Sequence, residues 1–76
     1  MINPFKLNKQ KKRLKTLKEV LAGYKEIHDE CKADIESGEG SEEYLAKTKV
    51  QMNKAKEKIK YVTSEIEAIK KAFPML

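Results

Sequence analysis

The pentapeptide Ser37-Gly38-Glu39-Gly40-Ser41 divides this chain of 76 residues into two halves of similar length. Glycine adopts the left-handed backbone conformation that often ends a helix, and serine is a preferred residue at a helix start. The pentapeptide therefore predicts that one helix ends here and another begins. We expect a helix over about 4–37, a turn at 38–41 and a helix over about 42–73, so that residues 1–76 form a single helical-hairpin domain.

Both halves carry a heptad pattern of the kind that forms the a/d seam of a coiled coil. In the first half the seam positions hold Leu7, Gln10, Leu14, Leu17, Leu21, Tyr24, His28, Cys31 and Ile35. In the second half they hold Leu45, Thr48, Met52, Ala55, Ile59, Val62, Ile66, Ile69, Phe73 and Leu76. A turn near Glu39 brings the patterns into one register, in which bulky Tyr24 faces small Ala55. The predicted fold class is all-α, a two-helix antiparallel coiled-coil hairpin.

Residues at the ends of both segments agree with this hairpin. Asn3 is suited to cap the first helix, with Pro4 at the first helical position. Gly38 is suited to end that helix, Ser41 to cap the second, and Pro74 to stop it.

Gly23 is the exception within the helical segments. It falls at an outer heptad position, where it costs about 1 kcal/mol relative to alanine. Two explanations remain open: a tolerated surface glycine, or a point of flexibility or of close approach by a partner.

Composition limits the class of protein. The length suits one domain without a catalytic cavity of ordinary size, and a charged fraction of 38% with no tryptophan suits solvated helices. One cysteine, Cys31, cannot form an internal disulfide. The first residues lack the apolar run of a signal peptide, and no stretch has the roughly 20 apolar residues of a membrane span. We expect a basic, cytoplasmic protein.

The net charge of +5 is unevenly distributed along the chain. Residues 1–25 carry eight basic and one acidic side chain, residues 26–46 carry one basic and eight acidic, and residues 47–76 carry eight basic and three acidic. In a hairpin, the turn end is therefore acidic and the open end basic. Two hairpins laid head to tail would match these charges, although the charges also serve simply to solvate the helices.

One flank of the seam, formed by the e positions, is almost entirely lysine. These positions hold Lys11, Lys18, Lys25, Lys32, Lys49, Lys56, Thr63 and Lys70. Like charges across a helix pair are destabilising, so the hairpin itself gives no reason to gather seven lysines on one edge. Six of them, Lys11, Lys18, Lys25, Lys49, Lys56 and Lys70, are candidate contacts to a nucleic-acid backbone or to an acidic protein surface.

The opposite flank, formed by the g positions, mixes apolar and polar residues. These positions hold Arg13, Val20, Ile27, Asp34, Tyr44, Gln51, Lys58, Glu65 and Ala72. Arg13 faces Glu65, and we expect an ion pair between them. Val20, Ile27 and Tyr44 widen the apolar stripe beyond what two helices need, which predicts packing against another protein. A second copy is the simplest candidate for this partner. Ordering each residue costs roughly 1.5 kcal/mol of conformational entropy, and two helices bury little apolar area to offset that cost. A four-helix bundle of two hairpins buries more area.

The open end is a further candidate surface. We expect its apolar residues to meet beside several lysines; they are Ile2, Phe5, Phe73, Met75 and Leu76. The cluster either seals the last layer of the seam or docks a protein. An anionic membrane is the less favoured partner.

Chemistry-bearing motifs are sparse. His28 and Cys31 share a helical face but occupy seam positions, which favours a structural role over a metal site. The sequence contains no glycine-rich phosphate loop, nucleophile elbow, zinc finger or aromatic stacking platform. We therefore expect no catalysis, no cofactor and no metal.

Two hypotheses follow. The first is a non-catalytic adaptor or regulator that self-associates, as a homodimer, and binds a protein partner through Val20, Ile27 and Tyr44 or through Phe5, Phe73 and Leu76. The alternative is a regulator that binds the backbone of RNA or DNA through the lysine-rich flank, with salt-sensitive affinity and little sequence selectivity.

Overall fold

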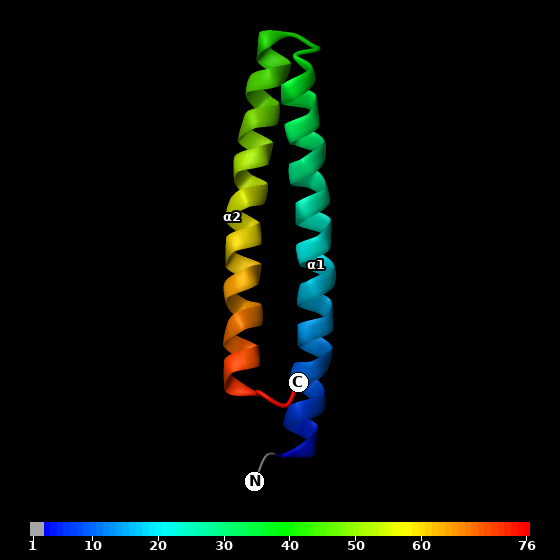
Figure 1. Ribbon diagram of the computed structural model, residues 1–76, viewed down its shortest axis with the longest axis vertical. Coiled ribbons are helices and arrows are strands. Elements are labelled where there is room, and N and C mark those ends of the chain that lie inside the picture. Colours follow the sequence, from blue (N-terminus) through cyan, green and yellow to red (C-terminus); the bar gives the residue numbers. More distant parts are fainter. Residues whose placement is uncertain (1–2) are drawn as a thin grey trace.

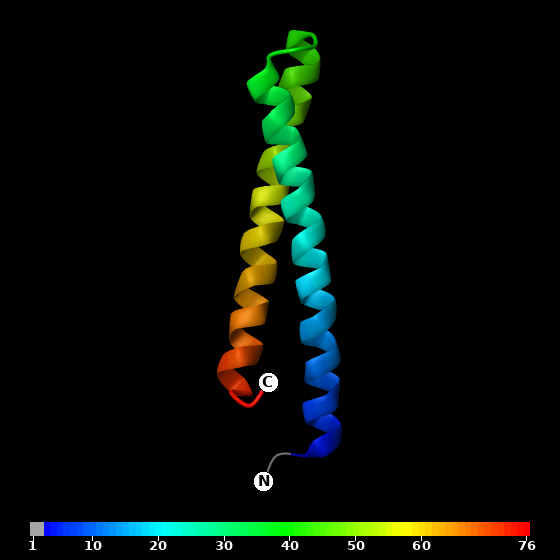
Figure 2. The same cartoon turned by 45° about the vertical axis from the view of Figure 1, so that its right-hand side comes forward.

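The computed structural model describes residues 3–76 and contains two long helices, α1 over Pro4–Ser37 and α2 over Glu42–Ala72. Figure 1 and Figure 2 show them side by side and antiparallel, joined by one short loop. The rod measures 58 × 14 × 14 Å. We call the end with the loop the turn end, and the end where α1 begins and α2 finishes the open end. The predicted all-α helical hairpin is confirmed.

The helix ends are capped by the residues that the sequence indicates. The Asn3 side chain accepts a hydrogen bond from the Phe5 amide at 2.9 Å, with Pro4 opening α1. Ser41 caps α2 by accepting from the Tyr44 amide at 3.1 Å. After α2 ends at Ala72, Pro74 cannot continue the helix.

The loop depends on its two glycines. Gly38 has φ = 67° and its amide donates to the carbonyl of Ile35 at 3.2 Å, which completes a left-handed helix cap. Gly40 has φ = 104°, and a Cβ there would lie 2.8 Å from Cδ1 of Tyr44. The loop therefore excludes a side chain at Gly40 for two independent reasons, backbone conformation and the Tyr44 ring.

Burial follows the heptad pattern closely. Within residues 3–76, every seam position is buried or half-buried, and the only other residues that are not exposed are Thr63 and Glu65. Contacts between the helices fix the register: Arg13 pairs with Glu65, and Asp34 pairs with Tyr44. Tyr24 and Ala55 line one shared groove, as the predicted register requires.

The seam is packed differently in its two halves. Toward the open end, Leu14, Ile66 and Ile69 form an apolar cluster, and the residues packed against it are Leu17, Leu21, Val62, Phe73 and Leu76. Toward the turn, the buried residues are Cys31, Thr48 and Ala55. The buried hydroxyl of Thr48 donates to the carbonyl of Tyr44 at 2.9 Å, so it is satisfied within its own helix.

The expected apolar cluster at the open end forms only in part. Phe73 and Leu76 pack onto the seam, and the tail after Pro74 turns toward α1 (Figure 1). Phe5 is 86% exposed, so its expected contact with this cluster is wrong, and Met75, at 78%, also stays outside the packed cluster. Phe5 occupies an outward heptad position on the first turn of α1, which extends beyond α2 (Figure 2). Ile2 lies outside the described residues.

Candidate functional site

The g flank, defined above by its heptad positions, exposes apolar side chains next to the seam. Val20 is 40% exposed, Ile27 is 45% exposed and Tyr44 is 48% exposed. Val20 and Ile27 lie two helical turns apart near the middle of α1, on the same face. These side chains are half-covered by the hairpin and half-open, which is the state expected of residues that flank a seam.

Polar contacts connect the two helices across this flank. Arg13 Nη2 lies 3.6 Å from Glu65 Oε2, which confirms the predicted ion pair. The Tyr44 hydroxyl donates to Asp34 Oδ2 at 2.9 Å, and the Cys31 thiol lies 4.0 Å from Gln51 Oε1. The g flank is therefore a defined surface in which side chains of α1 and α2 hold one another in place.

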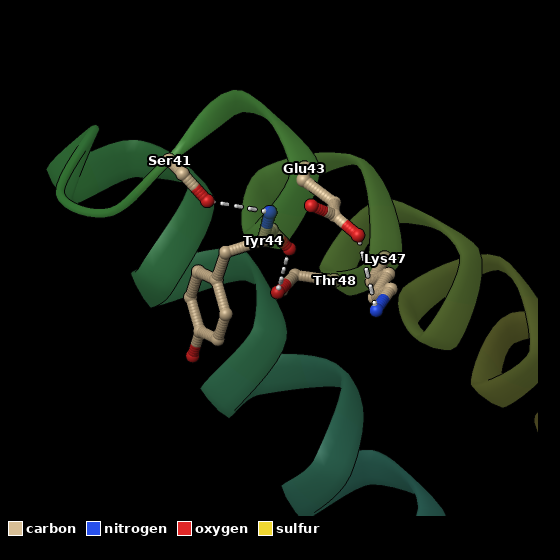
Figure 3. Close-up of polar contacts among 5 residues, drawn as sticks. All are labelled: Ser41, Glu43, Tyr44, Lys47 and Thr48. Atoms are coloured by element: carbon tan, nitrogen blue, oxygen red, sulfur yellow. Dashed lines mark hydrogen bonds and ion pairs between the residues drawn. The ribbon is translucent and has the colours of Figure 1, made fainter.

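Tyr44 is the most constrained of the exposed aromatic residues. Figure 3 shows its side chain reaching from the start of α2 toward α1, beside the Ser41 cap. The hydrogen bond to the Asp34 carboxylate, and then its negative charge, raise the pKa of the Tyr44 phenol above its ordinary value. Glu43 and Lys47 form a separate ion pair at 3.5 Å on the outer side of α2 (Figure 3).

A shallow groove runs between the helices on the g flank. Its lining residues are Tyr24, Ile27, Glu30, Cys31, Asp34, Gln51, Lys54, Ala55 and Lys58. The floor is formed by the large-against-small pair of the seam, Tyr24 and Ala55, and the rim carries charges of both signs. This mixture of apolar floor and charged rim suits a protein surface better than a small apolar ligand.

Gly23 lies on the same side of α1. It falls between Val20 and Ile27, one turn from each, and it is exposed. A Cβ added at Gly23 would meet nothing within 4 Å, so no contact inside the described chain requires glycine here. Sequence reasoning singled out Gly23, which occupies a c position beside the g flank, but did not connect it with that flank.

The e flank has a different character. All seven of its lysines are exposed, and among residues 3–76 none of them has a carboxylate within 4.0 Å. No ion pair in the described chain neutralises this row of charge, and eight of the twelve acidic side chains lie in residues 26–46, toward the turn end.

A second groove follows the e flank at the open end. Leu7, Leu14, Met75 and Leu76 provide its apolar part, and the surrounding lysines are Lys11, Lys12, Lys15 and Lys18. The fold of the tail after Pro74 creates this groove, which sequence reasoning did not predict. The turn at Pro74 was the available signal, since a chain that leaves a helix there can pack back onto its neighbour.

The predicted site residues therefore fall into separate groups. Val20, Ile27 and Tyr44 share the g flank, but Tyr44 lies near the turn end and the other two lie near mid-rod. Phe73 and Leu76 belong to the seam cluster, whereas Phe5 is isolated.

Residues 3–76 contain one histidine, His28, and one cysteine, Cys31. No group of three or more histidine, cysteine or acidic side chains lies close enough to hold a metal ion within residues 3–76. His28 Nδ1 lies 3.3 Å from its neighbour Asp29, and the buried Cys31 thiol faces Gln51. Neither α1 nor α2 contains an apolar stretch of the length needed to cross a bilayer.

Comparisons with protein-family models, with curated proteins and with solved structures give no match for this chain.

Proposed function

We propose that this protein is a non-catalytic helical-hairpin adaptor or regulator that acts by protein–protein interaction and associates with itself. The observation that carries the proposal is the half-exposed apolar row Val20 and Ile27 beside a thin core. Within residues 3–76 only six residues are buried, and no side chain is completely excluded from solvent. Covering the g flank with another protein surface would extend this core, as in a four-helix bundle.

Electrostatics support self-association as part of this function. The acidic turn end and the basic open end lie at opposite ends of a 58 Å rod. Head-to-tail pairing brings opposite charges together at both ends, whereas parallel pairing brings like charges together. We also propose a cytoplasmic location, because the buried, unpaired Cys31 thiol suits a reducing compartment.

The test compares two matched variants by light scattering at about 10 to 500 µM protein, a range chosen for micromolar affinities. Val20→Asp/Ile27→Asp places charge on the g flank, and Lys18→Gln/Lys25→Gln changes the net charge by the same amount at equivalent levels of the e flank. We expect the wild type to be larger than an 8.8 kDa monomer and only the g-flank variant to dissociate. Equal association of both variants would refute the g flank as the surface, and a monomeric wild type would refute self-association.

A second candidate function rests on the seven lysines of the e flank, none of which forms an ion pair in the described chain, and on the groove beside two of them, Lys11 and Lys18. In this alternative the e flank binds the backbone of RNA or DNA. Lys11→Gln/Lys18→Gln/Lys56→Gln/Lys70→Gln should then abolish retention of a nucleic acid at about 50 mM salt. If the wild-type protein binds no RNA or DNA at this salt concentration, the alternative is refuted and the first proposal stands.

A further inference from the structure

The outer face of α1 contains a second heptad row, formed by its c and g positions. The row consists of Arg13, Thr16, Val20, Gly23, Ile27, Glu30 and Asp34, all of them exposed. It lies about 110° around the helix from the seam, at the angle by which a helix in a four-helix bundle contacts a second neighbour. The row is thus a free helix face with the spacing of a packing surface.

The row is self-complementary about Gly23. When two copies of α1 run antiparallel with a two-fold axis beside Gly23, Val20 of one copy meets Ile27 of the other. Arg13 meets Asp34 at the same time, and Thr16 meets Glu30. An isologous interface requires this relation, in which residue i contacts residue j of the partner and residue j contacts residue i.

Glycine at the axis has a physical role in this arrangement. The two-fold axis is where the two helices cross, and a residue without a side chain lets them approach closely. Inside the hairpin nothing approaches Gly23, because an added Cβ would meet open space. No contact inside the described chain requires glycine at this position, whereas the close approach of a partner helix would.

The direction of pairing follows from charge. Residues 1–25 carry eight basic and one acidic side chain, and residues 26–46 carry one basic and eight acidic. Antiparallel α1 helices bring these stretches together, whereas parallel helices align like with like. Arg13 and Asp34 already have partners in their own chain, Glu65 and Tyr44, so each contact to the second copy extends an existing polar cluster.

Helix α2 fits the same axis with one unfavourable contact. In the dimer, the c and g positions of α2 face those of the second copy's α2. The residues that meet are Tyr44 with Ala72, Gln51 with Glu65, and Lys54 with Tyr61. The midpoint of these pairs lies within about half a helical turn of the level of Gly23. The exposed Tyr61 ring then gains a cation partner. Lys58 meets its own copy, which is the one unfavourable contact of this arrangement.

We propose that two copies of this chain pair head to tail through the c/g row of α1, with the two-fold axis at Gly23. This inference rests on the proposed self-association and specifies its surface, register and direction. The partner is a second copy because the complementary residues lie on the same row, so no foreign surface is needed to match them.

Cysteine pairing tests the axis directly. In a Cys31→Ala background, Gly23→Cys should form a disulfide-linked dimer under mild oxidation, because cysteines on a two-fold axis lie near each other. Ala33→Cys, exposed on the face of α1 opposite the seam and remote from the axis along the helix, and Lys25→Cys on the e flank are controls that should stay reduced. Circular dichroism confirms that each variant is helical.

The antiparallel orientation of the two α1 helices is tested by mixing the Arg13→Cys and Asp34→Cys variants. We expect the mixed disulfide to exceed both self-linked products, whereas a parallel pair favours the self-linked products. Gly23→Gln gives an independent readout: it should raise the melting temperature of dilute protein, because glycine is a poor helix former, yet weaken the dimer at least about tenfold.

The outcomes separate this inference from the broader proposal. If light scattering shows a dimer while Gly23→Cys stays reduced, or while the controls link equally well, the interface is wrong and self-association stands. A preference for self-linked Arg13→Cys overturns the direction. A monomer at every concentration overturns self-association itself, and with it this interface.

Discussion

The two flanks of the seam are built from equivalent positions on the same pair of helices, but only one of them is crossed by side-chain contacts. On the g flank, Arg13 meets Glu65 and Tyr44 meets Asp34. On the e flank, seven exposed lysines repel one another with no acidic partner among residues 3–76. The comparison indicates that the hairpin specifies the g flank as a structured surface and leaves the e flank as a row of charge for solvent or for an anionic partner.

The largest expected effect comes from the seam on which both flanks depend. Leu14→Ala removes a buried side chain of the main apolar cluster and should lower the free energy of unfolding by about 2–4 kcal/mol. Denaturant unfolding followed by circular dichroism measures this loss. Phe5→Ala is the control, because an exposed residue should change stability by less than about 0.5 kcal/mol. Equal losses in both variants would contradict the assignment of the core.

The next effect concerns the ion pair of the g flank. Arg13→Gln should lower the free energy of unfolding by about 0.2–1 kcal/mol, the range for exposed ion pairs. A double-mutant cycle with Glu65→Gln isolates the interaction, and its coupling energy should fall as salt is added. A coupling energy of zero at low salt would mean that the two charges do not interact across the helices.

Removing charge from the e flank should raise the free energy of unfolding instead of lowering it. Lys25→Gln/Lys56→Gln removes two facing charges and should raise the free energy of unfolding by about 0.3–0.5 kcal/mol at low salt. At about 1 M salt the gain should vanish, since screening acts over about 3 Å. Lys9→Gln/Lys60→Gln removes the same charge away from the flank and should give a smaller change. A loss of stability in the first variant would show that these lysines have partners within the hairpin.

The smallest effect is at Tyr44. Because the Asp34 carboxylate raises the pKa of its phenol, the hydrogen bond stabilises the fold below the ordinary tyrosine pKa of about 10 and is lost as pH rises through the higher folded-state value. Tyr44→Phe should therefore be slightly less stable than wild type at neutral pH and equally stable at high pH. The phenolate absorbance missing from this variant should titrate above pH 10, and Asp34→Asn should lower that midpoint. If the titration midpoint is the same in Asp34→Asn as in the wild type, the hydrogen bond is absent in solution.

Much of the fold follows from the sequence because its signals are local and repeated. As the heptads predict, every described seam residue from Leu7 to Leu76 is buried or half-buried. The helix caps at Asn3, Gly38 and Ser41 form as their residue types indicate. The pairing of Arg13 with Glu65 follows from register alone.

The features that could not be predicted depend on side-chain rotamers or on the path of the chain outside the helices. The hydrogen bond from Tyr44 to Asp34 needs the rotamer of the tyrosine, which heptad position does not give. The groove around Leu76 needs the path of the tail after Pro74. Phe5 does not join the open-end cluster because its heptad position faces away from the seam and because α1 begins beyond the end of α2. The first reason can be read from the heptad pattern, and the second cannot.

We propose that the g flank, and not the e flank, is the surface through which this chain meets another protein, first of all its own copy. Amide chemical shifts recorded by NMR from about 5 to 500 µM test it residue by residue over the micromolar range. We expect concentration-dependent shifts at Val20, Gly23 and Ile27, and stable shifts at Lys18 and Lys25. Shifts confined to the lysines, or none at any residue, would contradict the claim.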